Sequence, residues 1–157
     1  KGSWRSFIEP EKREEVVLNI TPIKKAIEGK RVILIDDSIV RGTSSKIIVK
    51  SKLKAAKEVS LLLTFPPIIY PCYAGIDFPT QEELLAYKVC KGKCSLEEIN
   101  ELVGKEVGVK TLGYNDVEGL SEGIGIPVDE LCLSCTTGDY GCFKYKPKFR
   151  TREEMKG

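Results

Sequence analysis

Two short apolar runs flank a helix-like pattern in the first half of the chain. Residues 31–36 read RVILID, and residues 59–65 form a second run that is followed by two prolines. Between them, apolar residues recur at roughly helical spacing from 44 to about 56. A strand, a helix and a strand at this length predict a βαβ unit with a parallel sheet and a right-handed crossover. Because RVILID is almost wholly apolar, we expect a central strand covered on both faces.

Shorter elements are predicted on either side of this unit. They are a strand over residues 16–20 and helices over 22–28, 80–89, 95–104 and from 115 onward. Thr80 with Glu83, and Ser95 with Glu98, form capping boxes at the starts of two of these helices. We therefore predict one α/β domain over residues 1–157, with a βαβ core over about 1–70 and a helical, cysteine-bearing appendage over about 71–157.

The charge balance adds little to this picture. Lys and Arg number 25 against 23 Asp and Glu, so no strong field for nucleic acid or an anionic membrane is expected. No apolar run approaches the roughly 20 residues of a membrane-spanning helix. The chain has no histidine, so a metal site would use cysteine or carboxylate, and a general base would be Asp, Glu, Lys or Tyr.

The segment 31–46, RVILIDDSIVRGTSSK, carries the clearest chemistry. Asp36 and Asp37 end the first strand, where parallel sheets place their ligands. Gly42 lets the backbone approach a ligand, and the helix start that follows favours an anion. Hydroxyl donors come from Ser38, Thr43, Ser44 and Ser45. The loop is suited to a phosphate, while the carboxylates suit ribose hydroxyls or Mg²⁺.

Three other readings of this segment compete with a sugar-phosphate site. An apolar strand that ends in Asp-Asp resembles a Walker B element, but the accompanying Gly-x-x-x-x-Gly-Lys-Ser/Thr loop is missing. Receiver domains also pair Asp residues at a strand end, but they lack the Gly-Thr-Ser-Ser loop in this register. The simplest alternative is a strand that merely ends in polar residues at the surface.

The six cysteines predict metal or redox chemistry ahead of structural disulfides. Cys132-x-x-Cys135 has a common metal-binding spacing, which is weak evidence alone. The alternative is that several cysteines are small buried apolar residues, and that Cys90 and Cys94 are ordinary thiols on a flexible connection.

Long stretches of the chain resemble glutamine phosphoribosylpyrophosphate amidotransferases. The matching strings occur in the family's order and are FIEPEKREEVVLNITPIKKAIEGKR, VILIDDSIVRGTSS, PPIIYPCYAGIDFPTQEELLAYK, LGYNDVEGLSEGIG and LCLSCTTGDY. The resemblance implies the C-terminal part of a type I phosphoribosyltransferase domain. In that family, ammonia from glutamine displaces pyrophosphate from phosphoribosylpyrophosphate (PRPP), which gives 5-phosphoribosylamine for purine synthesis.

The resemblance also implies roles for individual residues. Asp36 and Asp37 would hold the ribose 2- and 3-hydroxyls, Val40–Ser44 would wrap the 5-phosphate, and Ser38 with Ile39 would shape its entry. The expected substrate-binding residues are Asp36, Asp37, Ser38, Val40, Arg41, Gly42, Thr43 and Ser44, with Mg²⁺ accompanying PRPP. Catalysis would rest on positioning of the sugar and the pyrophosphate, so no catalytic residue is assigned in this chain.

For the cysteines, the resemblance implies a [4Fe–4S] cluster. Cys72, Cys132 and Cys135 match three of its thiolate ligands, and the fourth lies upstream in the family. The candidates for that ligand here are Cys90, Cys94 and Cys142, which depart from the family pattern and would alternatively form a zinc site.

Two departures qualify the expected activity. The chain starts at Lys1, without the family's glutaminase half or its upstream transferase loops, so we expect a glutaminase-bearing partner chain, a homo-oligomer and a cytoplasmic location. The crossover over residues 53–59 is shorter than the family's and lacks its glycine, so its helix must end differently. Two alternatives to the enzyme remain, a non-catalytic PRPP- or nucleotide-sensing module and an iron–sulfur or zinc protein.

Overall fold

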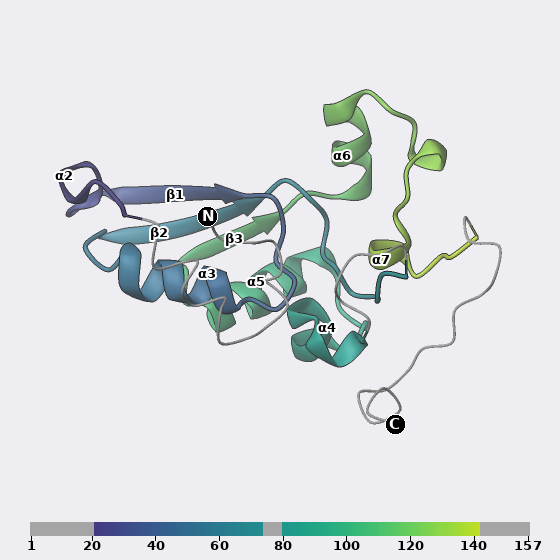
Figure 1. Ribbon diagram of the computed structural model, residues 1–157, viewed down its shortest axis with the longest axis horizontal. Helices are drawn as coiled ribbons and strands as arrows, with labels where there is room; N and C mark the ends of the chain where they lie inside the picture. The colour runs from purple at the N-terminus through teal and green to yellow at the C-terminus, as the bar shows by residue number, and fades with distance from the viewer. Residues whose placement is uncertain (1–20, 74–79, 142–157) are drawn as a thin grey trace, which may run out of the picture.

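The computed structural model describes residues 21–73 and 80–141 (Figure 1). The strands are β1 (Arg31–Asp36), β2 (Glu58–Leu63) and β3 (Thr111–Tyr114). The α-helices are α2 (Lys24–Ile27), α3 (Thr43–Ile47), α4 (Leu85–Cys90), α5 (Leu96–Val107), α6 (Val117–Ile124) and α7 (Ser134–Thr137). A π-helical turn, η2 (Ile48–Lys52), continues α3, and the 3₁₀ turns η3 (Gln81–Glu83) and η4 (Val128–Glu130) precede α4 and α7.

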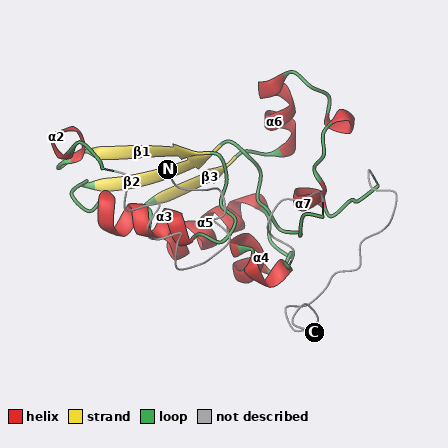
Figure 2. Cartoon of the chain, in the orientation of Figure 1, coloured by secondary structure: helices red, strands yellow, loops and turns green. Residues whose placement is uncertain are grey.

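The three strands form one parallel sheet in the order β1-β2-β3 (Figure 2). The pairing of β1 with β2 through α3 confirms the predicted parallel βαβ unit. The third strand was missed by the sequence analysis, because TLGY is too short to show a clear alternation. It lies within the region that was expected to be a helical appendage, so the sheet extends beyond residue 70.

Helices α3 and α5 lie along one face of the sheet, α4 lies beside α5 near the carboxyl ends of the strands, and α6 and α7 lie beyond those ends (Figure 1). The main core forms between the sheet and helices α3, α4 and α5. Leu61 of β2 and both Val103 and Val107 of α5 are fully buried there. Burial of a side chain of this size stabilises the fold by about 1.5–3 kcal/mol.

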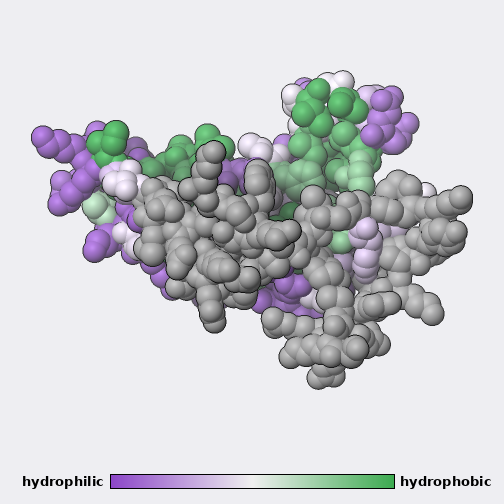
Figure 3. Space-filling model, in the orientation of Figure 1, coloured by the Kyte–Doolittle hydropathy of each residue, from purple (hydrophilic) through white to green (hydrophobic). Residues whose placement is uncertain are grey.

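The opposite face of the sheet is exposed, so the prediction that β1 is a central strand covered on both faces is wrong. Among the strands that the structure describes, β1 is at an edge of the sheet, and its side chains alternate between exposed and half-buried. Ile33 and Ile35 are 64% and 65% exposed, and Leu62 of β2 is 45% exposed. An apolar run is expected to be covered on both faces, but the helices in the described part of this chain pack on one face only. Figure 3 shows the hydrophobic surface along β1 and over α6.

Helix α5 confirms its predicted capping box but not its predicted end. The Ser95 hydroxyl accepts a hydrogen bond from the Glu98 N–H, and the Glu98 carboxylate accepts one from the Ser95 N–H. The helix continues through Gly104 and ends before Gly108, which has a φ of 90°. A Cβ on Gly104 would lie 3.2 Å from the Cβ of Leu112, so this glycine allows close packing of α5 on β3.

The other predicted helices are shorter or start later than expected. The helix predicted over 22–28 spans Lys24–Ile27, and Asp116 rather than Asn115 caps α6 by accepting from the Gly119 N–H. Thr80 does not open a helix directly, because its hydroxyl donates to the Glu83 carboxylate and η3 intervenes before α4. The strand predicted over 16–20 lies outside the described residues.

The crossover from β1 to β2 ends without a glycine, as its sequence requires. The α3 helix widens into the π-helical turn η2, in which the Leu53 N–H donates to the Ile48 carbonyl at 3.0 Å. Among the described helices, none combines the length and the apolar character needed to cross a bilayer.

Leu61 and Leu62 provide a matched test of this architecture. We expect Leu61→Ala to lower the free energy of unfolding by about 2–5 kcal/mol, because it leaves a cavity under the sheet. Leu62→Ala, on the open face, is expected to cost less than half as much. Urea denaturation of both variants measures the difference, and equal losses would contradict the assignment of the two faces.

Candidate functional site

The acidic pair lies at the carboxyl end of β1, where the backbone turns away from the sheet. The Asp36 carboxylate accepts a hydrogen bond from the Asp37 N–H at 3.0 Å, and the Asp37 carboxylate accepts one from the Ser38 N–H at 2.6 Å. Asp36 is half-buried and Asp37 is exposed. Burial raises the pKa of Asp36 above its ordinary value, and the neighbouring Asp37 charge adds to the rise. A bound cation or hydroxyl donor would relieve this cost of holding two carboxylates together.

The backbone just after β2 holds the acidic pair in place. The Thr64 N–H donates to the Asp36 carbonyl at 3.1 Å, and the Phe65 N–H donates to the Asp37 carbonyl at 3.0 Å. The parallel ladder therefore continues past the ends of both strands. These bonds use the backbone carbonyls of Asp36 and Asp37. Each carboxylate side chain accepts from the N–H of the next residue and lies at the carboxyl end of the sheet.

After the acidic pair, residues Ser38–Ser45, here called the Ser38–Ser45 loop, form a turn and the start of α3. Ile39 is 2% exposed and anchors the loop in the core. Gly42 precedes the helix with a φ of 76°, a left-handed conformation that favours glycine, and it is buried. Thr43 and Ser44 form the first turn of α3 and are partly exposed, whereas Ser45 is buried. The backbone N–H groups and hydroxyls of this turn are suited to bind an anion.

The segment that begins α4 packs directly against this loop. The Leu85 N–H donates to the Val40 carbonyl at 2.7 Å. The Arg41 guanidinium forms an ion pair with the Glu83 carboxylate at 2.6 Å. The Leu85 side chain lies so close to Gly42 that a Cβ at this position would overlap Leu85 Cδ2. Sequence reasoning placed Glu83 only in a helix capping box and gave no role to Leu85, because only the fold brings residues 83–85 to the loop.

A pocket of about 670 Å³ opens beside the acidic pair. It is bounded by the loop after β1, the segment after β2 and one side of α6. Its lining residues are Asp37, Ser38, Val40, Thr64, Phe65, Ile68, Asn115, Gly119, Leu120, Gly123, Ile124 and Cys135. The end of each strand contributes, as expected for a ligand site at the carboxyl edge of a parallel sheet. Sequence reasoning treated Asn115 only as a helix start, because its place at the end of a strand depends on β3, which was not predicted.

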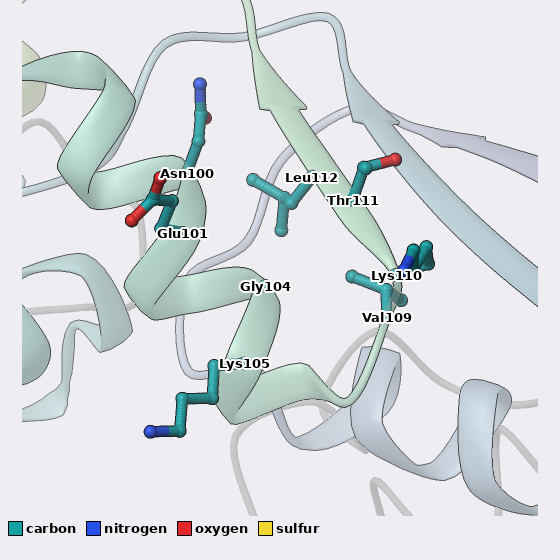
Figure 4. Close-up of a pocket in the computed structure, with 8 residues that line it drawn as sticks. All are labelled: Asn100, Glu101, Gly104, Lys105, Val109, Lys110, Thr111 and Leu112. Atoms are coloured by element: carbon teal, nitrogen blue, oxygen red, sulfur yellow. The ribbon is translucent and has the colours of Figure 1, made fainter.

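The structure does not bring all of the predicted site residues into this pocket. Asp37, Ser38 and Val40 line it, whereas Arg41 and Thr43 line a separate hollow of about 400 Å³ on the outer side of α3 and η2. A third hollow, of about 480 Å³, lies between α5 and residues 109–112 (Figure 4). None of the predicted site residues lines that third hollow.

Three of the cysteines belong to one region of the structure. The carbonyl of Cys135 accepts hydrogen bonds from the Ile69 and Tyr70 N–H groups, both at 2.9 Å. This contact brings α7 beside the segment that carries Cys72, and both thiols pack on the same small apolar cluster. Burial raises the pKa of Cys135, and the nearby Cys72 and Cys132 thiols add to the rise. Among the described residues, no three Cys, Asp or Glu side chains are arranged to hold a metal ion.

Two of the other three cysteines differ from the expected role as metal ligands. Cys90 and Cys94 are joined in a disulfide at the end of α4, so in this state neither is free to supply the fourth ligand. The disulfide corrects the expectation of metal or redox chemistry ahead of structural disulfides at these two positions, and also the alternative that they are ordinary thiols on a flexible connection. Cys142 lies outside the described residues.

The sheet and the loop together define a phosphoribosyltransferase-like α/β fold with an acidic pair at the edge of the sheet. No protein-family model matches the chain. The chain is 46% identical over 140 residues to the amidophosphoribosyltransferase of Methanocaldococcus jannaschii and 49% identical over 139 residues to that of Pyrococcus horikoshii. In both cases the match covers 87% of this chain, but only 27% and 28% of the relative.

A solved structure leads to the same family. The glutamine PRPP amidotransferase of Bacillus subtilis, complexed with ADP and GMP, matches with a TM-score of 0.61 and 40% identity, over 84% of this chain and 28% of that one. The chain is therefore homologous to a segment of the amidophosphoribosyltransferases, as its sequence predicts. It spans about a quarter of the length of these relatives.

The contact between Gly42 and Leu85 can be tested against a second glycine of similar conformation. Gly29 also has a positive φ, of 67°, but a Cβ there would meet nothing within 4 Å. We expect Gly29→Ala to cost about 1 kcal/mol of stability and Gly42→Ala to cost about 1–3 kcal/mol more, from overlap with Leu85. Thermal unfolding measures both losses. Equal losses would show that Leu85 does not confine Gly42.

Proposed function

We propose that this chain is the PRPP-binding part of an amidophosphoribosyltransferase. The observation that carries the proposal is the acidic pair beside an anion-binding loop at the carboxyl edge of a parallel sheet. The homology to amidophosphoribosyltransferases over 87% of the chain supports it. The GMP in the structure of the Bacillus subtilis relative is a ribose phosphate, the class of ligand that such a site would take.

In this proposal, the two halves of the site hold different parts of the substrate. The carboxylates of Asp36 and Asp37 accept hydrogen bonds from the ribose hydroxyls. The backbone N–H groups of the loop and the hydroxyls of Ser38, Thr43 and Ser44 donate to the 5-phosphate. Two such anchors fix the sugar in one orientation, which lowers the entropic part of the barrier to substitution.

The reaction that we propose is substitution at the anomeric carbon. The lone pair of ammonia forms the new C–N bond, the C–O bond to pyrophosphate breaks, and pyrophosphate leaves with that electron pair. The nitrogen then loses one proton to water or to the released pyrophosphate, which gives the amine. Mg²⁺ would accompany PRPP and offset the charge of its phosphates. Glutamine hydrolysis and the remaining transferase loops would come from protein outside these residues, in a homo-oligomeric, cytoplasmic enzyme.

We further propose that Cys72, Cys132 and Cys135 supply three thiolates to a [4Fe–4S] cluster. Their location in one region supports this proposal, as does the packing of two of them on a common apolar cluster. A fourth thiolate would come from Cys142 or from protein outside this chain. When bound, the cluster would tie α7 to the segment after β2, which also borders the pocket beside Asp37.

The alternatives are less well supported. A sensor module would need the same sugar-phosphate site and differs only in the absence of turnover. A purely structural metal protein would not require the acidic pair or the glycine at the loop. Homology that includes both the loop and the cysteine segment favours the enzyme.

Removing one charge from the acidic pair tests the sugar site. We expect Asp37→Asn to weaken GMP binding about tenfold or more, because a charge-assisted hydrogen bond contributes about 1.5–3 kcal/mol. Isothermal titration calorimetry of the 157-residue chain measures the affinity. Asp129→Asn, at an exposed position away from the sheet, is the matched control. Unchanged affinity in Asp37→Asn would remove this carboxylate from the site.

Replacement of one clustered thiol tests the cofactor proposal. After anaerobic purification we expect visible absorbance and iron in the unmodified chain, and loss of both in Cys135→Ser, together with a lower melting temperature. Cys94→Ser should keep the absorbance. A colourless, iron-free unmodified chain would contradict the proposal.

A further inference from the structure

We propose that Glu83 is a positioning residue that sets the conformation of the Ser38–Ser45 loop for phosphate binding. The inference rests on the proposed function and concerns the same site. Glu83 lies 42 residues from Arg41 in the sequence, yet its carboxylate accepts from Arg41 Nε at 2.8 Å and pairs with Arg41 Nη2 at 2.6 Å. An arginine bound through two nitrogens is fixed in direction as well as in place.

The ion pair is sheltered enough to hold its geometry. The side chains of Arg41 and Glu83 are only 21% and 19% exposed, so water screens their attraction less than at an open surface. A surface pair would contribute little, but a partly buried pair with two hydrogen bonds restricts both side chains. The pair therefore limits the positions that the loop backbone at Arg41 can take.

Glu83 is also held in place by a residue outside the Ser38–Ser45 loop. The hydroxyl of Thr80, which is 1% exposed, donates to the other carboxylate oxygen of Glu83 at 2.7 Å. The next three residues, 84–86, are all buried and fix the start of α4 in the core. Glu83 thus presents an oriented carboxylate from a segment anchored in the core, which is the support that a precise binding site requires.

Three consecutive loop residues depend on this one segment. Val40 is held through its carbonyl by the Leu85 N–H, Gly42 is confined by the Leu85 side chain, and Arg41 between them is held by Glu83. These contacts fix the turn from which α3 begins. The N–H groups that would bind the 5-phosphate belong to this turn, so their alignment depends on Glu83.

The direction of the Arg41 side chain has a second consequence. The Arg41 guanidinium pairs with Glu83, so its charge is engaged there and not with the phosphate. We therefore expect the N–H groups and hydroxyls of the loop to bind the phosphate. Loss of Glu83 would release the Arg41 charge but also loosen the turn. Whether phosphate affinity falls or rises therefore separates positioning from simple charge neutralisation.

The test compares GMP with guanosine, which has the ribose but no phosphate. We expect Glu83→Ala to weaken GMP binding to the 157-residue chain about tenfold and to leave guanosine binding unchanged, as measured by calorimetry. Glu83→Gln loses the charge, but its amide oxygen can still accept from Arg41 while its NH2 group donates to the Thr80 hydroxyl, so it should weaken GMP binding less, about threefold. Glu82→Ala, with the same charge change at an exposed neighbour on η3, should bind GMP as the unmodified chain does.

A double variant checks that Glu83 acts through Arg41. If it does, Arg41→Ala combined with Glu83→Ala should lose no more GMP affinity than Glu83→Ala alone, since the pair is already broken. Independent, additive losses would overturn the inference.

The remaining outcomes are also decisive. Unchanged or increased GMP affinity in both Glu83 variants would overturn the positioning role. A parallel loss of GMP and guanosine binding with a lower melting temperature would show that Glu83 only supports the fold, and would overturn it as well. If the unmodified chain binds neither ligand, the proposed function itself fails, and that result is distinct from every outcome that concerns Glu83 alone.

Discussion

The close contact between Gly42 and Leu85 is the constraint on which the loop depends. A glycine with a left-handed backbone allows the chain to turn from β1 into α3, and its missing Cβ leaves room for Leu85. The Leu85 N–H then reaches the Val40 carbonyl, and the ion pair between Arg41 and Glu83 forms beside it. A loop of small and flexible residues thereby obtains one conformation from a helix that lies more than 40 residues away in the sequence.

Much of this arrangement could be predicted from local sequence. RVILID predicted a strand, the residues after it predicted a loop and a helix, and Ser95 with Glu98 predicted the start of α5. These predictions succeed because each depends on contacts within a few residues. The family resemblance also follows from the strings themselves and is confirmed by the relatives.

The rest required contacts between distant residues. Strand β3 is only four residues long and is recognisable through its pairing with β2. The exposure of Ile33 and Ile35 depends on which helices cover the sheet, and an apolar sequence does not reveal this. Likewise, the hydroxyl of Thr80 was expected to cap a helix, but it orients Glu83 instead. Cys90 and Cys94 were expected to be candidate metal ligands, with free thiols as the alternative, yet the turn after α4 brings them together in a disulfide.

The central claim is that the acidic pair and the loop form one sugar-phosphate site. Backbone amide chemical shifts of the chain, followed by NMR during a titration with ribose 5-phosphate, test it most directly. The account predicts that the largest shifts occur in residues 36–45, and that ribose without phosphate shifts Asp36 and Asp37 but not the amides of residues 42–45. Shifts confined to the hollow between α5 and β3, or no shifts at saturating ligand, would contradict it.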